Sequence, residues 1–330
     1  MRKITVRILK IAISIILIGF LLRRVGPDRV ITQFYRADPF WLGCALLLFS
    51  ISHIAGSFQW WVLLRAEKVN ILWIRTLQYY FIGLFFNNFL ISGMGGDLFR
   101  MMDVRRSTKN GAAAVSTVFL DRFMGFFVLS GLAVLASPWF LLQSGFHMKL
   151  GWILMLLLVC WILVLFLLFN KRFARPLAWL LKRWIPEKIT AKVRTVYNQI
   201  HDFGRKKNLF LDIALLSLAI QSARIFTHYL IARALGVELP PHLFFLIIPL
   251  VAIVASLPIS MGGVGLREQT GIILFGLVGL GDVEAFSVEF MAYLVAVVTS
   301  LPGGLLFVFQ SYDMIRAGQS REKMNSKGGI

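Results

Sequence analysis

Charged residues are scarce in this sequence. Asp, Glu, Lys and Arg make up only 15% of its 330 residues, whereas roughly a quarter is usual for a soluble domain. Hydrophobic residues make up 58%, so the chain cannot cover its apolar surface with polar groups and needs lipid as part of its solvent. The composition excludes a soluble globular protein. It predicts an all-α polytopic membrane protein without a soluble domain of any size.

The patterns that hold disulfides, metals or nucleotides are also missing. Cys44 and Cys160 each lie within an apolar run, at a spacing that suits neither a disulfide nor a metal site. The sequence contains no zinc-protease, P-loop or nucleophile-elbow motif. Gly263-x-Gly265 follows an apolar segment with Pro258 rather than a strand, so it lacks the context of a dinucleotide site. We therefore expect no cofactor and no metal, and we do not expect an enzyme.

Negative charge is scarcer than positive charge. The chain has 16 Asp and Glu residues against 35 Lys and Arg residues, which gives a formal net charge of +19. The basic residues fall in short links between apolar runs, a placement that marks the cytoplasmic side of a membrane protein and attracts anionic headgroups. Membrane lipids are therefore the expected partners, and nucleic acid is not. We expect an inner-membrane protein with both termini in the cytoplasm; no pattern indicates its oligomeric state.

Six apolar runs have the roughly 17–25 residues that a membrane-spanning helix needs. They cover residues 4–22, 40–64, 112–135, 152–169, 209–235 and 286–309. The first run follows a basic start and has the general form of a signal peptide. No small-residue cleavage site comes after it, so we expect it to remain as a helix.

Two further apolar runs, residues 71–99 and 243–280, are interrupted by polar residues, glycine or proline. The first is broken near Asn87-Asn88 and at residues 93–96, and the second at Pro258 and Gly262-Gly263. Irregular backbone inside a membrane is stable only where it is buried in protein or lines a polar cavity. These two runs are therefore the first place to look for function.

The charges of the links decide how these two runs enter the membrane. The link at 171–207 holds 11 basic residues against two acidic ones, and the link at 98–110 is also basic, whereas the link at 281–284 is acidic. Both basic links face the cytoplasm if each interrupted run enters and leaves on one side. The sequence therefore predicts about six spanning helices plus two re-entrant hairpins, the first from the cytoplasmic side and the second from the exterior side.

The basic segment 171–208 also contains apolar residues such as Leu180, Leu181, Trp184 and Ile185. This mixture favours an amphipathic helix that lies on the cytoplasmic leaflet. A solvated connecting loop is the alternative.

The two halves of the chain resemble each other. Residues 91–100 and 259–267 share an Ile-Ser start, a glycine turn and a following arginine, with Met94 and Met261 separated by 167 positions. Residues 61–66 resemble residues 229–234 at an offset of 168. With the opposite sidedness of the hairpins, this predicts an inverted repeat of residues 1–145 and 146–330. Inverted repeats with broken helices are typical of transporters, and a duplicated scaffold without transport is the alternative.

Charged and polar residues inside apolar runs need a partner or a purpose. Asp121 and Arg122 lie inside the run 112–135, and Arg224 lies inside the run 209–235. These charges either serve a bound headgroup or pair internally and lock helices together. Asn87 and Asn88 either cap a broken helix or line a cavity.

Two arginines, Arg100 and Arg267, follow the glycine turns of the interrupted runs, and each has an acid nearby, Asp97 or Glu268. A glycine turn that opens a short helix presents free N–H groups and a positive dipole end to a phosphate or carboxylate. Arginine adds a bidentate fork for the same group. We predict that both arginines contact an anionic headgroup, with Asp97, Glu268 and the Asp121-Arg122 pair as counter-ions or proton carriers. The turns that would cradle the headgroup are Gly95-Gly96 and Gly262-Gly263.

At these residues the sequence resembles a flippase-like family that includes the transmembrane region of lysylphosphatidylglycerol synthases and archaeal proteins of dolichol-linked glycosylation. The resemblance covers roughly residues 7–312, and Ile91 departs from it where the family usually has proline. The matching motifs are Gly95-Gly96-Asp97-x-x-Arg100 within residues 88–100, Ser116-x4-Asp121-Arg122-x2-Gly125, Leu257-Pro258-x-Ser260-x-Gly262-Gly263-x-Gly265-x-Arg267-Glu268, and Pro302-Gly303-Gly304.

The resemblance implies movement of a lipid, or of a lipid-linked sugar or amino-acid headgroup, between leaflets. The last expected helix ends at residue 309 of 330, so we expect no aminoacyl-transferase domain of the kind that the synthases carry. One alternative is a membrane-embedded transferase that acts on a polyprenyl or phospholipid carrier, with Glu268 or Asp121 as base. Another is a scaffold for envelope-biosynthesis enzymes.

Overall fold

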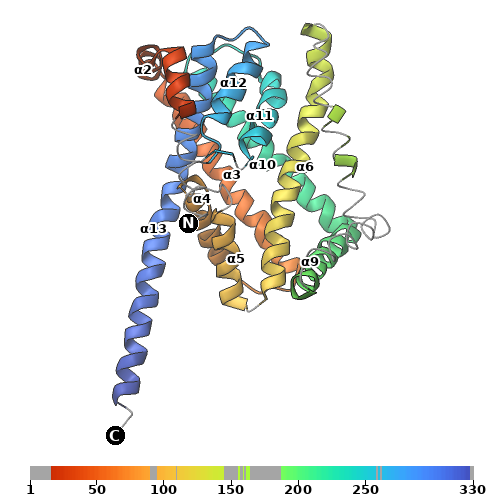
Figure 1. The fold of residues 1–330 in the computed structure, drawn as a ribbon, viewed down its shortest axis with the longest axis vertical. Coiled ribbons are helices and arrows are strands. Elements are labelled where there is room, and N and C mark those ends of the chain that lie inside the picture. The colour runs from red at the N-terminus through yellow and green to blue at the C-terminus, as the bar shows by residue number, and fades with distance from the viewer. Residues whose placement is uncertain are drawn as a thin grey trace.

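Every regular element of the described residues is a helix (Figure 1). The computed structural model describes residues 16–89, 95–108, 110–144, 187–257, 259–260 and 262–327, and a few isolated residues between 155 and 163. Residues 16–25 are helical. The labelled helices are α2 (Pro27–Tyr35), α3 (Pro39–Ala66), α4 (Trp73–Phe89), α5 (Gly95–Thr108), α6 (Gly111–Ser144), α9 (Glu187–Arg205), α10 (Lys207–Ala234), α11 (Pro241–Ala255), α12 (Leu266–Gly276) and α13 (Asp282–Lys327).

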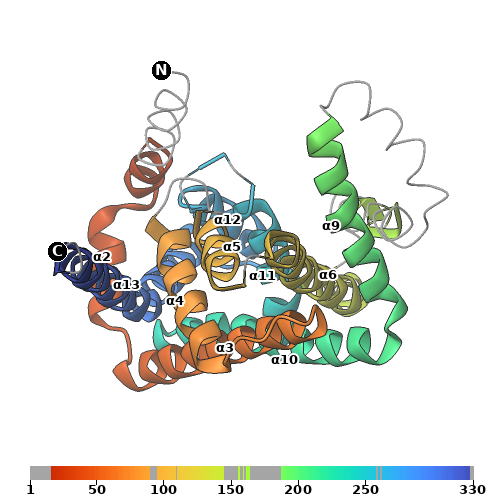
Figure 2. The ribbon, with the colours of Figure 1, turned by 90° about the horizontal axis from the view of Figure 1, so that it is seen from below.

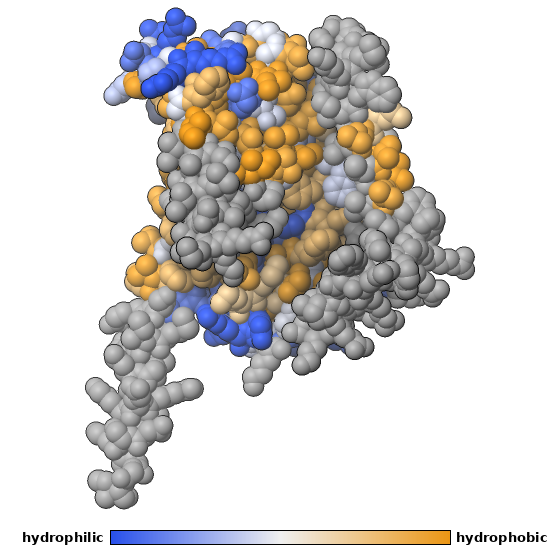
Figure 3. All heavy atoms as spheres, viewed as in Figure 1, coloured by the Kyte–Doolittle hydropathy of each residue, from blue (hydrophilic) through white to orange (hydrophobic). Residues whose placement is uncertain are grey.

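Four of these helices are long and apolar enough to cross a membrane. They are α3, α10, the stretch Gly111–Ser137 of α6 and the stretch Asp282–Gln310 of α13. Most of their residues are not buried inside the protein, and large apolar side chains such as Leu47 and Val308 point outward, as lipid-facing residues do. Figure 3 shows the resulting band of hydrophobic atoms on one face. The prediction of an all-helical integral membrane protein is confirmed.

The four helices coincide with the predicted runs at 40–64, 112–135, 209–235 and 286–309. The other two predicted spans, 4–22 and 152–169, lie largely outside the described residues.

Each interrupted run forms two helices with a break between them: α4 and α5 in the first run, α11 and α12 in the second. In Figure 1, α4 and α5 lie in the half of the bundle from which the end of α13 projects, and α11 and α12 lie in the other half. α5 leads into α6 at one end of the bundle, whereas α12 leads into α13 at the opposite end. Both α5 and α12 therefore begin near the middle of the bundle and run outward in opposite directions.

The second break depends on glycine. Between α11 and α12, Gly262 and Gly263 have φ angles of 60° and 82°, a left-handed conformation that residues with a Cβ atom disfavour. A Cβ atom on Gly263 would also lie 2.7 Å from the carbonyl oxygen of Ala255. The turn can therefore fold back on the end of α11. In the first run, residues 90–94 lie outside the described residues.

The helices pack in matched pairs. α3 runs alongside α10 (Figure 2), α4 packs against α13, and α6 packs against α11. α5 packs against both α4 and α6, and α12 packs against both α11 and α13. Each of the short helices α5 and α12 is therefore held between the helix before it and the helix after it.

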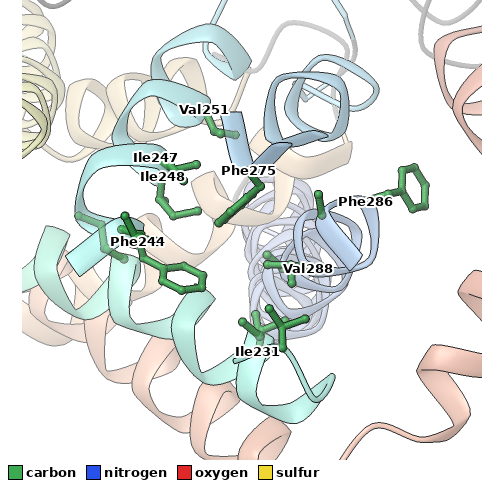
Figure 4. Packing of buried hydrophobic residues seen from close by; sticks show 14 of the residues in the cluster. Ile231, Phe244, Ile247, Ile248, Val251, Phe275, Phe286 and Val288 are labelled. Carbon is green, nitrogen blue, oxygen red and sulfur yellow. The ribbon is translucent and has the colours of Figure 1, made fainter. Parts of the chain in front are cut away.

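The largest apolar cluster lies around the second broken run (Figure 4). Phe244 and Ile247 of α11 meet Phe275 of α12, Val288 of α13 and Ile231 of α10, and all five are almost completely buried. Because apolar burial removes these faces from both water and lipid, the cluster holds the short helices in place between the spanning ones.

The basic segment 171–208 is described only from residue 187 onward. There it forms α9, whose Ile200 and Phe203 are buried in one cluster with Leu120 and Met124 of α6. α9 therefore packs an apolar face against α6, and its location on the cytoplasmic leaflet stays a prediction.

Candidate functional site

Four charged side chains of α5 and α6 form one ion-pair network. A guanidinium nitrogen of Arg100 lies 2.8 Å from a carboxylate oxygen of Asp121 and another lies 3.4 Å from Asp97. Arg122 holds Asp97 with two hydrogen bonds, of 2.9 and 3.1 Å. The sequence neighbours Asp121 and Arg122 are thus not each other's partners. Each instead bonds to a residue of the broken helix, so the network fixes α5 to α6.

Arg100 is the buried centre of this network. Only 3% of the residue is exposed, and its guanidinium lies over the rings of Trp60 and Tyr80, at 4.1 and 4.7 Å from their centroids. Gln59 of α3 donates a 3.0 Å hydrogen bond to Asp121. Two carboxylates and two aromatic faces therefore surround Arg100 within the protein.

Arg122 differs from Arg100 in its access to the surroundings. Its side chain is 45% exposed, although it lies near the middle of the apolar stretch Gly111–Ser137. A cation that faces lipid at this depth is costly. Its open side therefore needs water or an anionic group.

The two asparagines at the end of α4 have separate tasks. The Asn87 side chain accepts a 2.9 Å hydrogen bond from the backbone N–H of Gly96, so it caps the start of α5. Asn88 donates a 3.1 Å hydrogen bond to the carbonyl oxygen of Ala296 in α13. Gly96 packs against the backbone of Gly83, where a Cβ atom would overlap the carbonyl oxygen. Of the two roles that the sequence left open, Asn87 takes the capping role.

The break between α11 and α12 lies close to the end of α4. A Cβ atom placed on Gly262 would lie 3.6 Å from the carbonyl oxygen of Asn88 and 4.0 Å from that of Asn87. The N-terminal ends of α5 and α12, with their positive dipole ends, are therefore directed toward one central region. Figure 3 shows a recessed hydrophilic area at about mid-height of the otherwise hydrophobic face.

The second hairpin has a different arrangement of charges. Glu268 is fully buried, and one of its oxygens accepts a 2.6 Å hydrogen bond from the backbone N–H of Gly265. It thus caps its own helix instead of pairing with Arg267. Arg267, which is half-buried, forms no ion pair with any described residue. The predicted equivalence of Arg100 and Arg267 therefore holds for their position in the chain but not for their bonding in this conformation.

Arg224 of α10 lies close to the first network. It donates a 3.2 Å hydrogen bond to the hydroxyl of Tyr80, and the ring of Tyr80 also lies under Arg100. His228, one turn later, lies 3.0 Å from the carbonyl oxygen of Arg224. The structure thus brings Arg224 together with Arg100, Asp97, Asp121 and Arg122.

Sequence reasoning missed one buried acid, Glu289 of α13, which has no exposed surface. A lone carboxylate inside the apolar run 286–309 is a signal in itself. The repeat offset is a second signal, because Glu289 follows Asp121 by 168 positions.

These features define an integral membrane protein with two discontinuous helices and buried charges at its centre. The chain belongs to the family described as the lysylphosphatidylglycerol synthase TM region, whose model matches residues 7–304. It is 25% identical to a UPF0104 membrane protein of Pyrococcus horikoshii over 90% of this chain and 95% of that protein. It is 22% identical to a UPF0104 membrane protein of Methanothermobacter thermautotrophicus, over 82% of this chain and 85% of the relative.

Proposed function

We propose that this protein moves a phosphate-bearing phospholipid or lipid-linked headgroup between the leaflets of the inner membrane, as a flippase or scramblase. The observation that carries the proposal is the position of Gly262, where an added Cβ atom would lie 3.6 Å from the carbonyl oxygen of Asn88 at the end of α4. Because the neighbouring Asn87 caps the start of α5, the N-terminal ends of α5 and α12 both lie near this point, and such ends attract anionic groups. Arginines on α5, α6 and α12 lie next to these ends.

We further propose that the two halves form an inverted repeat whose rearrangement exposes the central region to one leaflet and then to the other. The matched packing of α4 with α13 and of α6 with α11 supports this proposal. So does the placement of the two hairpins in opposite halves of the bundle (Figure 1). Membership in a family of lipid-related membrane regions is consistent with it.

Within this proposal, Arg122 and Arg267 hold the headgroup phosphate, and Arg100 supports them. Arg122 keeps 45% of its side chain exposed while it bonds to Asp97. Arg267 has no ion pair among the described residues. Arg100 is buried and already bonded to two carboxylates, so its charge is neutralised within the protein. Its role is to hold Asp97, and through Asp97 the guanidinium of Arg122, in place.

An apolar groove offers a place for the acyl chains. It has a volume of about 770 Å³ and lies between α3, α4 and α13. Leu47, Ile54, Ile74, Phe81 and Leu306 are among the residues that line it. A lipid whose tails stay in such a groove need move only its headgroup through the polar centre. The chain has no ATP motif, so we propose that transport runs downhill or on an ion gradient.

The test is leaflet exchange of fluorescent phosphatidylglycerol in liposomes that contain the purified protein. Arg122→Ala should slow exchange about tenfold or more, since a hydrogen bond to a charged group contributes about 1.5–3 kcal/mol. Arg122→Lys should recover part of the rate because it keeps the charge but loses the bidentate fork. Arg65→Ala is the matched control, because Arg65 is exposed and bonds to Asn70 at the end of α3.

Melting temperatures of the same preparations separate a lost site from a lost fold. A well-folded Arg122→Ala variant with the wild-type exchange rate would place the headgroup site elsewhere. Absence of exchange by the wild-type protein would reject the transport proposal. In that case, product formation from a labelled polyprenyl or phospholipid carrier would favour the transferase alternative.

A further inference from the structure

α13 carries a buried carboxylate that forms no hydrogen bond with any described residue. Glu289 lies two turns after the start of α13 and is completely buried. Neither of its carboxylate oxygens has a hydrogen-bond partner in the described part of the chain. Its Cγ lies against Gly271 of α12, where an added Cβ atom would come within 2.5 Å. An ionised carboxylate without a partner is very costly to bury in protein or lipid.

Two charged groups of α12, Arg267 and Glu268, lie close enough to Glu289 to act on its charge. One oxygen of Glu268 accepts the Gly265 N–H, but its other oxygen has no partner among the described residues. Within the described part of the chain, the region therefore holds two buried acids with three unsatisfied carboxylate oxygens and one arginine that forms no ion pair.

The other described groups around this region are titratable, but none of them is a carboxyl group. His228 of α10 and Tyr293 of α13 lie near the same Arg267. His53 of α3 and Tyr80 of α4 lie side by side, close to Arg224. Glu289 and Glu268 are therefore the two groups here that can exchange a negative charge for a neutral acid.

The first half of the chain contains a corresponding arginine and carboxylate that do form an ion pair. Arg100 and Asp121 bond at 2.8 Å between α5 and α6. Arg267 and Glu289 occupy the corresponding positions, 167 and 168 residues later, on α12 and α13. In this conformation the first pair is formed, whereas the second is not.

We propose that Glu289 is a proton-binding site whose occupancy decides whether Arg267 can hold a headgroup phosphate. With the proton bound, Glu289 is a neutral acid, and Arg267 is available to the phosphate. When the proton leaves to water, the carboxylate pairs with Arg267, as Asp121 pairs with Arg100, and competes with the phosphate. Proton and phosphate therefore bind together, and each raises the affinity for the other. The coupling to transport rests on the proposed function; the proton site does not.

The proton site is tested without any transport measurement. Dicyclohexylcarbodiimide modifies buried carboxyl groups in their protonated form, and mass spectrometry locates the label in the full-length protein in liposomes. We expect Glu289 to be labelled at mildly acidic pH, with labelling that falls about tenfold for each pH unit above its midpoint. Glu289→Gln should abolish this label. Glu284→Gln, five residues earlier on the same helix, should leave it unchanged.

A label that is absent from Glu289, or that does not respond to pH, would overturn the proton site. Exchange of fluorescent phosphatidylglycerol then tests the coupling. The wild-type rate should rise as pH falls, and Glu289→Gln should remove this pH dependence. If Glu289 takes the label but the protein moves no lipid, the proposed function fails and the proton site stands. If lipid moves with the same pH dependence in Glu289→Gln, the coupling is wrong.

Discussion

At the scale of single residues, the first charge network is internally balanced. Asp97 and Asp121 face Arg100 and Arg122, so two negative groups meet two positive ones. Removal of Arg100 would leave Asp121 without its ion-pair partner, whereas Asp97 would keep Arg100 as a partner if Arg122 were removed. Because Arg100 is buried and Arg122 is partly exposed, we expect substitution of Arg100 to reduce stability more than substitution of Arg122.

Arg100→Ala is expected to destabilise the protein. It leaves Asp121 without its 2.8 Å partner and removes the cation between Trp60 and Tyr80. Breaking a buried pair costs about 3–5 kcal/mol, so the melting temperature in detergent should fall steeply. The melting temperature of Arg100→Lys should fall less, since lysine retains the positive charge. An Arg100→Ala variant that melts with the wild-type protein would show that the network contributes little to folding.

At the scale of helices, glycine sets how closely α13 approaches α4. Gly303 of α13 is buried, and a Cβ atom there would overlap the backbone carbonyl of Phe81 in α4. Small residues at helix–helix contacts in membranes allow such close packing. The Pro302-Gly303-Gly304 motif, which appears in the sequence as a family feature, thus has a packing role.

Gly303→Ala is expected to force α4 and α13 apart and lower stability by about 1–3 kcal/mol, the usual cost of overpacking. Gly131→Ala is the matched control. Gly131 lies on an exposed position of α6 with no atom near its would-be Cβ. That change should be neutral or stabilise by up to about 1 kcal/mol. The test is to measure the melting temperatures of both variants. Equal melting temperatures for Gly303→Ala and Gly131→Ala would contradict the packing argument.

At the scale of the whole molecule, the links before α6 and before α13 lie at opposite ends of the bundle (Figure 1). Cysteines placed at Asn110 and Gly281, both exposed, should therefore react with an impermeant thiol reagent from opposite sides. The basic link at 98–110 predicts that Asn110 faces the cytoplasm, and the acidic link at 281–284 predicts that Gly281 faces the exterior. Cys44 and Cys160 are replaced by serine beforehand. Labelling of both positions from one side would reject the predicted orientation of the hairpins.

Local signals made the helices predictable, whereas the site required tertiary structure. Apolar run length and the Gly262-Gly263 turn marked the spanning helices and the second break, because both act within a few residues. Asp97 bonds more closely to Arg122 than to Arg100, which is nearer in the sequence. The packing of α5 on α6 determines this pairing. Glu289 was overlooked although the repeat offset from Asp121 leads to it.

Biosynthesis gives the charge network an order of assembly. All four of its members lie between residues 97 and 122, so the growing chain can neutralise them on leaving the ribosome, before any of the second half exists. The hydrogen bond from Asn88 to Ala296 of α13 must wait until almost the whole chain has been made. The four charges can therefore pair with one another before α13 is synthesised, whereas the hydrogen bond that ties the end of α4 to α13 can form only afterwards.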